Sequence, residues 1–144
     1  MSDLYETDIL DWSERQAALL RRVAAGDRTN HEVPDWDNII EEIESAGRSE
    51  LRACESLLVQ ALLHELEISA WPQSRDVPHW RAEAREFRRD AVRAFSPSMR
   101  QRIDMAALYA DALDRLPDSI DGQAPLPVPT ECPLTLDEML KVQS

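Results

Sequence analysis

The residues best able to do chemistry are acids, arginines and a histidine between positions 41 and 81. Residues 41–50 read EEIESAGRSE, and the apolar run that follows ends in HELE at 64–67. On a helix, side chains three or four residues apart project together, so two carboxylates and an arginine would share one face. Carboxylates and an imidazole can hold a divalent cation or transfer protons. The candidate polar cluster comprises Glu41, Glu44, Arg48, His64, Trp80 and Arg81.

Metal binding is the less favoured interpretation of this cluster. Its ligands would be Glu41, Glu44 and His64, but a di-iron bundle requires Glu-x-x-His on two helices and this chain has His-x-x-Glu once. The favoured interpretation is a solvated or salt-bridged acidic face, with His64 as an interior imidazole bonded to a carbonyl or carboxylate. We therefore predict no metal and no cofactor. The three glycines are also too scattered for a phosphate-binding loop.

Nucleophilic catalysis finds little support among the remaining side chains. Cys54 precedes His64 by ten residues on one predicted helical segment, about 15 Å along its axis, which is too far for a reactive pair. Cys54 falls on an apolar face, where a free thiol behaves as a small hydrophobe. We expect Cys54 and Cys132 to be free thiols in a reducing compartment.

Helical periodicity dominates the elements that must position these groups, and no alternating run predicts a sheet. The first helix is expected at 8–25, with an apolar stripe, and it is closed by Gly26. A loop at 27–34 leads to a second helical segment at 35–70. One straight helix of that length would exceed the diameter of a compact domain, so we predict a bend or a split near Gly47. The first stripe contains Ile9, Trp12, Leu19, Leu20 and Val23.

The third helix is expected from about His79 to Phe95, with aromatic and alanine residues on one face and arginines elsewhere. A fourth is expected near Met99 to Leu116. Prolines then predict an extended arm at 117–134, and a capping-box pattern predicts a short helix at 135–142. The sequence predicts an all-α, single-domain bundle of four main helices over 1–144, with its core at about 5–116. The fourth helix would be lined by Ile103, Ala106, Ala110 and Leu113.

Charge is unevenly distributed along a chain whose net charge is −12. Residues 1–50 carry 13 acids and 5 arginines, whereas residues 75–102 carry 8 arginines and 4 acids. We predict that Arg81, Arg85 or Arg88 pairs with the acids of 41–50 and joins the second and third helices, because the arginine fork binds carboxylates at two points. The acidic total opposes nucleic-acid binding, which would show affinity that falls steeply with salt.

No membrane segment is predicted, because no stretch approaches the ~20 apolar residues that cross a bilayer. The acidic beginning of the chain, MSDLYETDILDW, lacks the basic and apolar regions of a signal peptide. The sequence therefore predicts a cytoplasmic protein.

A set of landmark residues falls in order along the chain: Tyr5-Glu6-Thr7-Asp8 with Trp12, EEIE at 41–44, Gly47-Arg48-Ser49-Glu50, His64, Trp80-Arg81, Pro97-Ser98, Tyr109 and Glu131-Cys132-Pro133. In these residues the chain resembles a bacterial family known as domain of unknown function twenty-nine. The resemblance implies an all-helical, single-domain bacterial protein and carries no catalytic assignment. Two positions depart from the family pattern, with Glu67 where a basic residue is frequent and His79 where a serine precedes the tryptophan. A role requiring positive charge near His64 is thereby disfavoured.

Two functions are compatible with these patterns. The favoured hypothesis is a noncatalytic module that binds another protein or a second copy of itself, because no convincing reactive constellation is present. The alternative is a metal-assisted hydrolase acting on phosphodiesters, with Glu41, Glu44 and His64 as ligands or base and Arg48 and Arg81 as anion contacts.

Overall fold

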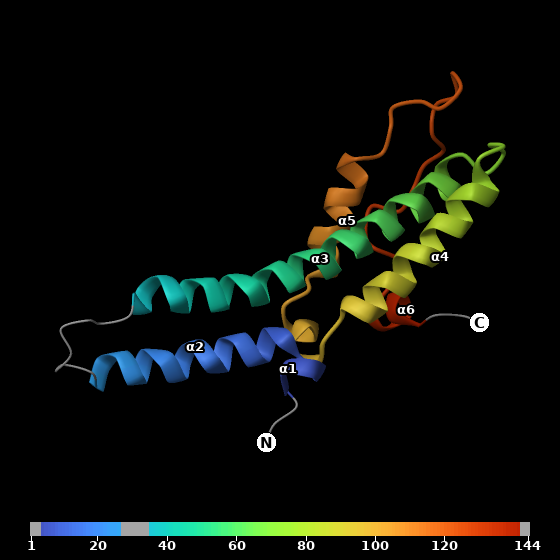
Figure 1. The fold of residues 1–144 in the computed structure, drawn as a ribbon. Coiled ribbons are helices and arrows are strands. Elements are labelled where there is room, and N and C mark those ends of the chain that lie inside the picture. Colours follow the sequence, from blue (N-terminus) through green and yellow to red (C-terminus); the bar gives the residue numbers. More distant parts are fainter. Residues whose placement is uncertain (1–3, 27–34, 142–144) are drawn as a thin grey trace. The chain divides into compact units, whose positions relative to one another are not determined.

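Residues 4–26 and 35–141 are described by the computed structural model, so the predicted loop at 27–34 lies outside the described residues. The chain divides into two compact units (Figure 1). Unit 1 consists of Met1–Arg52 and Ser96–Arg102, and unit 2 of Ala53–Phe95 and Ile103–Ser144. The predicted all-α class is confirmed, with α2, α3, α4 and α5 as the four main helices. The single domain over 1–144 stays a prediction.

Unit 1 contains α1 (Leu4–Thr7), α2 (Ile9–Gly26), the first part of α3 (Trp36–Ala70) and the 3-10 helix η1 (Pro97–Gln101). The predicted first helix, α2, is therefore preceded by the separate short helix α1, and Asp8 lies between the two. The Asp8 carboxylate accepts a hydrogen bond from the backbone N–H of Asp11 at 3.0 Å. An acceptor at this position satisfies an N–H group that has no partner within the first turn of a helix.

The buried stripe of α2 differs from the predicted one. Leu10, Ser13 and Ala17 are buried, whereas Leu19 and Val23 are 46% and 54% exposed. The small side chain of Ser13 allows Gly47 of α3 to approach closely, which sequence hydrophobicity alone does not indicate. The prediction was wrong for Leu19 and Val23, because it followed the largest apolar residues.

Gly47 lies inside α3, which runs without interruption from Trp36 to Ala70. The helix is long, as predicted, but it is not split at Gly47, and the bend stays a prediction. A Cβ placed at Gly47 would lie 2.0 Å from Oγ of Ser13 and 3.1 Å from Cδ1 of Leu10. Gly47 is therefore required for close contact between α2 and α3.

Unit 2 contains the remainder of α3, α4 (Val77–Ala94), α5 (Met105–Asp114) and α6 (Leu136–Leu140). The predicted face of α4 is confirmed, since Trp80, Ala84 and Ala91 are buried. Residues from α3 complete the core around them. The largest fully buried side chains of unit 2 are Leu58, Leu62, Met139 and Cys54.

The predicted fourth helix at 99–116 is two elements instead of one. Pro97–Gln101 forms η1, and α5 begins only at Met105. Asp104 caps the start of α5, because its side chain accepts hydrogen bonds from the N–H groups of Ala106 and Ala107. The residues buried on α5 are Leu108, Tyr109 and Ala112.

The predicted face of α5 was consequently wrong. Ala106 and Ala110 are exposed, and Ile103 and Leu113 are only partly buried. All four residues line an open groove of about 690 Å³ between α5 and the segment around 130–136. Burial of Tyr109 decided the orientation of α5. The hydroxyl of Tyr109 donates to the carbonyl of Pro129 at 2.6 Å.

The proline-rich arm contains no helix over residues 117–134, as predicted. It reverses direction at Asp121 and Gly122, whose φ angles are 51° and 75°. The arm is attached to the end of α3, because Trp71 Nε1 donates to Gln123 O at 2.9 Å and Leu126 N donates to Ala70 O at 2.9 Å. The predicted capping box is confirmed in α6, which begins after Thr135 with reciprocal bonds between Thr135 and Glu138.

Within the described ranges 4–26 and 35–141, no helix combines the length and apolar content needed to span a bilayer.

Candidate functional site

The candidate polar cluster is distributed over both units. Glu41, Glu44 and Arg48 belong to unit 1, whereas the other three members belong to unit 2. Each group therefore has its own surroundings. The members in unit 2 are His64, Trp80 and Arg81.

In unit 1 the carboxylates of the cluster are engaged by arginines. Glu41 Oε1 lies 2.5 Å from Arg48 Nη2, and Glu44 Oε1 lies 2.5 Å from Arg21 Nη2. The second pair joins α3 to α2. Exposed ion pairs of this kind contribute about 0–1 kcal/mol each. These acids thus neutralise neighbouring guanidinium groups, which is the salt-bridged face favoured by the sequence.

The cross-helix ion pairs predicted for the arginines of α4 do not match the observed partners. Glu41 and Glu44 pair with Arg48 and Arg21, as described above. Arg88 instead donates to the carbonyls of Met139 at 3.0 Å and Glu138 at 2.5 Å. Carbonyls at the end of a helix have no partner within the helix, and Arg88 supplies donors to those of α6. Sequence reasoning missed this role because α6 is about 50 residues away along the chain.

His64 lies in a largely buried position in unit 2. Its Nδ1 is 3.0 Å from Oε1 of Glu67, and the side chains are 16% and 12% exposed. The imidazole also stacks on Phe87, with ring centroids 5.7 Å apart and planes 15° apart. The interior position beside a carboxylate agrees with the sequence, and the predicted hydrogen bond of His64 to a carbonyl or carboxylate stays a prediction.

The electrostatics of Glu67 follow from this environment. Burial, which disfavours the charged carboxylate, raises the pKa of Glu67 above its ordinary value of 4.5. The neighbouring His64 acts in the opposite direction and Asp76 in the same direction as burial. A buried carboxyl beside an imidazole can exchange a proton, but proton transfer in catalysis also requires a reacting group within reach.

The thiol of Cys54, ten residues before His64 on α3, is poorly suited to act as that reacting group. Cys54 is fully buried, and its Sγ donates to the carbonyl of Ala91 at 3.6 Å. Burial, with a smaller contribution from Glu55, raises the pKa of the Cys54 thiol to about 11. Because the thiolate is the nucleophile, such a cysteine is inert at neutral pH.

Trp80 and Arg81 are neighbours in sequence with different environments. Trp80 is 6% exposed and belongs to an apolar cluster with Ala70, Trp71 and Val77. Arg81 is exposed on the outer side of α4. Trp80 is therefore a core residue, and Arg81 is available to solvent.

Metal coordination requires several donors at one point. Among the residues described, no group of three or more His, Cys, Asp or Glu side chains is arranged to hold an ion. His79 approaches Glu83 at 4.0 Å on the exposed side of α4, which is a pair and not a set of ligands.

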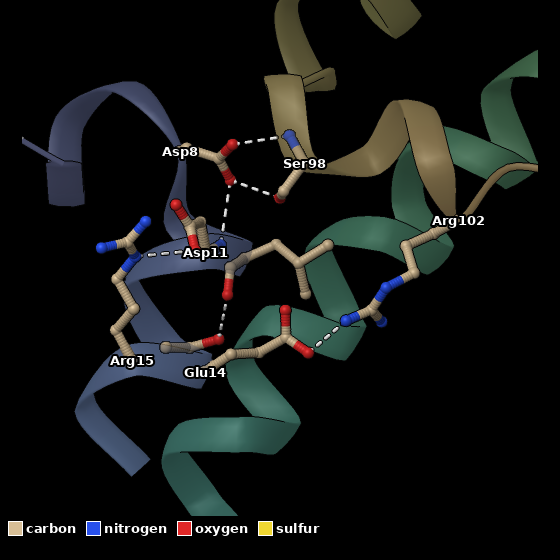
Figure 2. A network of polar contacts seen from close by, with 8 residues as sticks. Asp8, Asp11, Glu14, Arg15, Ser98 and Arg102 are labelled. Atoms are coloured by element: carbon tan, nitrogen blue, oxygen red, sulfur yellow. Dashed lines mark hydrogen bonds and ion pairs between the residues drawn. The ribbon is translucent and has the colours of Figure 1, made fainter. Parts of the chain in front are cut away.

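A polar network that the sequence did not single out joins α2 to η1 (Figure 2). The carboxylate of Asp8 accepts hydrogen bonds from both the N–H of Ser98 at 2.7 Å and its hydroxyl at 2.8 Å. Burial alone would raise the pKa of Asp8, but the hydrogen bonds from Asp11 and Ser98 outweigh it and lower the pKa. Arg102 and Glu14 form a further ion pair between the same elements. The available sequence signal was an aspartate, a residue type preferred at helix N-termini, directly before the first residue of α2.

Comparisons with known proteins agree with the all-helical fold. A family model described as Domain of unknown function DUF29 matches residues 4–143. The chain also resembles an alpha-helical protein of unknown function from Rhodospirillum rubrum, with 26% identity and a TM-score of 0.80 over 97% of this chain and 90% of that one. The curated proteins include no match. The chain belongs to the family described as Domain of unknown function DUF29.

Proposed function

We propose that the protein is a noncatalytic helical interaction module that binds another protein or a second copy of itself. The observation that carries this proposal is an exposed apolar face on the helix pair of unit 1. Leu19 and Val23 of α2 are 46% and 54% exposed, and Ile39 of α3 is 40% exposed. We call these three residues the apolar face.

Helix geometry supports a common orientation for the three side chains. Arg21 and Glu44 meet on one side of the α2–α3 pair. Successive helical residues are rotated by about 100°, so residues 19 and 23 project about 160° from Arg21, and Ile39 about 140° from Glu44. The apolar face therefore lies on the side of the pair opposite this ion pair, where both helices contribute to it.

Burial of this face would favour association. Full burial of a leucine, valine or isoleucine side chain stabilises by about 1.5–3 kcal/mol, and these residues begin about half exposed. In a symmetric dimer each residue would be buried twice, once in each copy. The net charge of −12 opposes self-association, so added salt should strengthen it by screening the repulsion.

The proposal is tested by sedimentation velocity of the purified full-length chain and by recovery of partners from host lysate. We expect Leu19→Ser/Val23→Ser/Ile39→Ser to abolish association while circular dichroism shows an unchanged helix content. Leu126→Ser is the matched control, because Leu126 is 53% exposed but lies in unit 2. A wild-type chain that is strictly monomeric and retains no partner would overturn the proposal.

A further inference from the structure

A row of arginines occupies the outer side of α4 in unit 2. Arg81, Arg85 and Arg89 are all exposed and follow one another at intervals of four residues. Each interval rotates the side chain by only about 40°, so the three guanidinium groups form one stripe with a rise of about 6 Å between neighbours. Val92, which is 38% exposed, lies in the same sector. We call Arg81, Arg85 and Arg89 the basic stripe.

The basic stripe has no ion-pair partner within 4–26 and 35–141, the ranges that the structure describes. This separates it from the other arginines of α4. Arg88 is bound to carbonyls of α6, and Arg93 lies 3.5 Å from Asp90. Three exposed guanidinium groups thus remain unneutralised in a chain whose net charge is −12.

Most acids of α4 are turned away from the basic stripe. Relative to Arg85, the side chains of Glu83 and Asp90 project about 160° and 140° around the helix, whereas Glu86 projects about 100° and lies about 60° from Arg89. Glu86 therefore borders the stripe beside Arg89, and no carboxylate of α4 lies closer than about 100° to Arg81 or Arg85. The apolar core face, with Trp80 and Ala84 buried, occupies another sector of the helix.

We propose that the basic stripe docks an acidic helical segment of a partner protein. A helix with carboxylates at intervals of four residues repeats every ~6 Å and matches the arginines in register. Each arginine fork can bind a carboxylate at two points, and Val92 offers an apolar contact beside them. This interaction concerns unit 2 and is independent of the apolar face in unit 1.

An acidic protein segment fits this surface better than a nucleic acid does. Single-stranded nucleic acids are bound by aromatic side chains stacked on bases as well as by positive charge. On α4, Trp80 is 6% exposed and Phe87 is stacked on His64, so neither aromatic ring joins the stripe. The acidic total of the chain would also repel a long polyanion more strongly than a short acidic helix.

The test measures binding of a synthetic helical peptide, with glutamate at every fourth position, to the full-length protein by fluorescence anisotropy. We expect affinity to fall as salt is raised and to fall by about tenfold in Arg81→Gln/Arg85→Gln/Arg89→Gln, as three exposed ion pairs are lost. The control Arg22→Gln/Arg52→Gln/Arg75→Gln changes net charge equally at exposed positions elsewhere and should bind like wild type.

Three results would overturn the proposal. These are absence of peptide binding at low salt, equal loss of affinity in both triple variants, and stronger binding of a DNA duplex than of the peptide at the same salt. Circular dichroism of both variants establishes that they are folded. Salt also separates this interaction from association through the apolar face, because salt should weaken the first and strengthen the second.

Discussion

Replacement of Gly47 by alanine changes the free energy of unfolding through two effects of opposite sign. Alanine inside a helix is favoured over glycine by about 1 kcal/mol. At Gly47, however, the added Cβ would lie 2.0 Å from Oγ of Ser13, with Cβ of Ser13 at 3.2 Å and Cδ1 of Leu10 at 3.1 Å behind it. Overpacking of a buried contact costs about 1–3 kcal/mol. Ser13 is fully buried and its hydroxyl donates to Leu10 O at 2.8 Å, so rotation offers little relief.

Because the 2.0 Å approach to Oγ of Ser13 is severe, the overpacking cost should be about 2–3 kcal/mol. After subtraction of the gain of about 1 kcal/mol from helix propensity, we expect Gly47→Ala to destabilise the protein by about 1–2 kcal/mol. For a chain of this length the melting temperature should fall by about 3–6 °C, measured by circular dichroism at the helical minimum. Ser13→Ala removes the closest atom, so Ser13→Ala/Gly47→Ala should recover stability relative to Gly47→Ala, with a coupling energy above about 0.5 kcal/mol.

Gly26→Ala is the matched control for this substitution. Gly26 ends α2, and a Cβ there would meet nothing within 4 Å. We expect its melting temperature to be unchanged or slightly raised. A Gly47→Ala variant that is as stable as Gly26→Ala would refute the close approach of α2 and α3 as the reason for glycine at 47.

Three further outcomes are expected from the titratable groups. Because hydrogen bonds lower the pKa of Asp8 below 3.8, its stabilisation is complete above that pH and is lost as pH falls through the folded value. Asp8→Asn should thus cost about 1.5–3 kcal/mol in urea denaturation at pH 7 and progressively less as pH falls through the folded value. Burial raises the pKa of Glu67 above 4.5, so the charged carboxylate destabilises the folded protein, and the free energy of unfolding should rise as pH falls through the folded value. Glu67→Gln should remove this rise without loss of stability at pH 7. Cys132 is only partly buried, whereas the pKa of Cys54 is about 11, so a thiol reagent at pH 8 should modify Cys132 first and reach Cys54 only on unfolding.

Predictions from sequence succeeded where a helix is amphipathic along its whole length. On α4 the apolar residues recur at intervals of three and four, and burial of Trp80, Ala84 and Ala91 confirms the face. The capping box at Thr135 was also confirmed, because the two side chains that cap α6 are three residues apart and need no distant partner. Local spacing is sufficient information for features of this kind.

Predictions from sequence failed where a distant segment selects the buried side. On α2 the largest apolar residues predicted a stripe with Leu19 and Val23, but close contact with Gly47 favours the small side chain of Ser13 at the interface. On α5 the alanines predicted one face, but Tyr109 is buried with its hydroxyl bound to Pro129. Both choices depend on the shape of a partner that is far away in the chain.

The sequence by itself determined the helical class, the capping box of α6 and the proline-rich arm without a helix, because each depends on residues within a few positions of one another. Tertiary structure alone decided which charges pair and which remain free. Arg88 is bound to carbonyls of α6 about 50 residues away, while Arg85, three residues before it, is exposed on the basic stripe. Coulomb and hydrogen-bond energies depend on distance in space, and folding sets that distance between residues that composition and spacing cannot bring together.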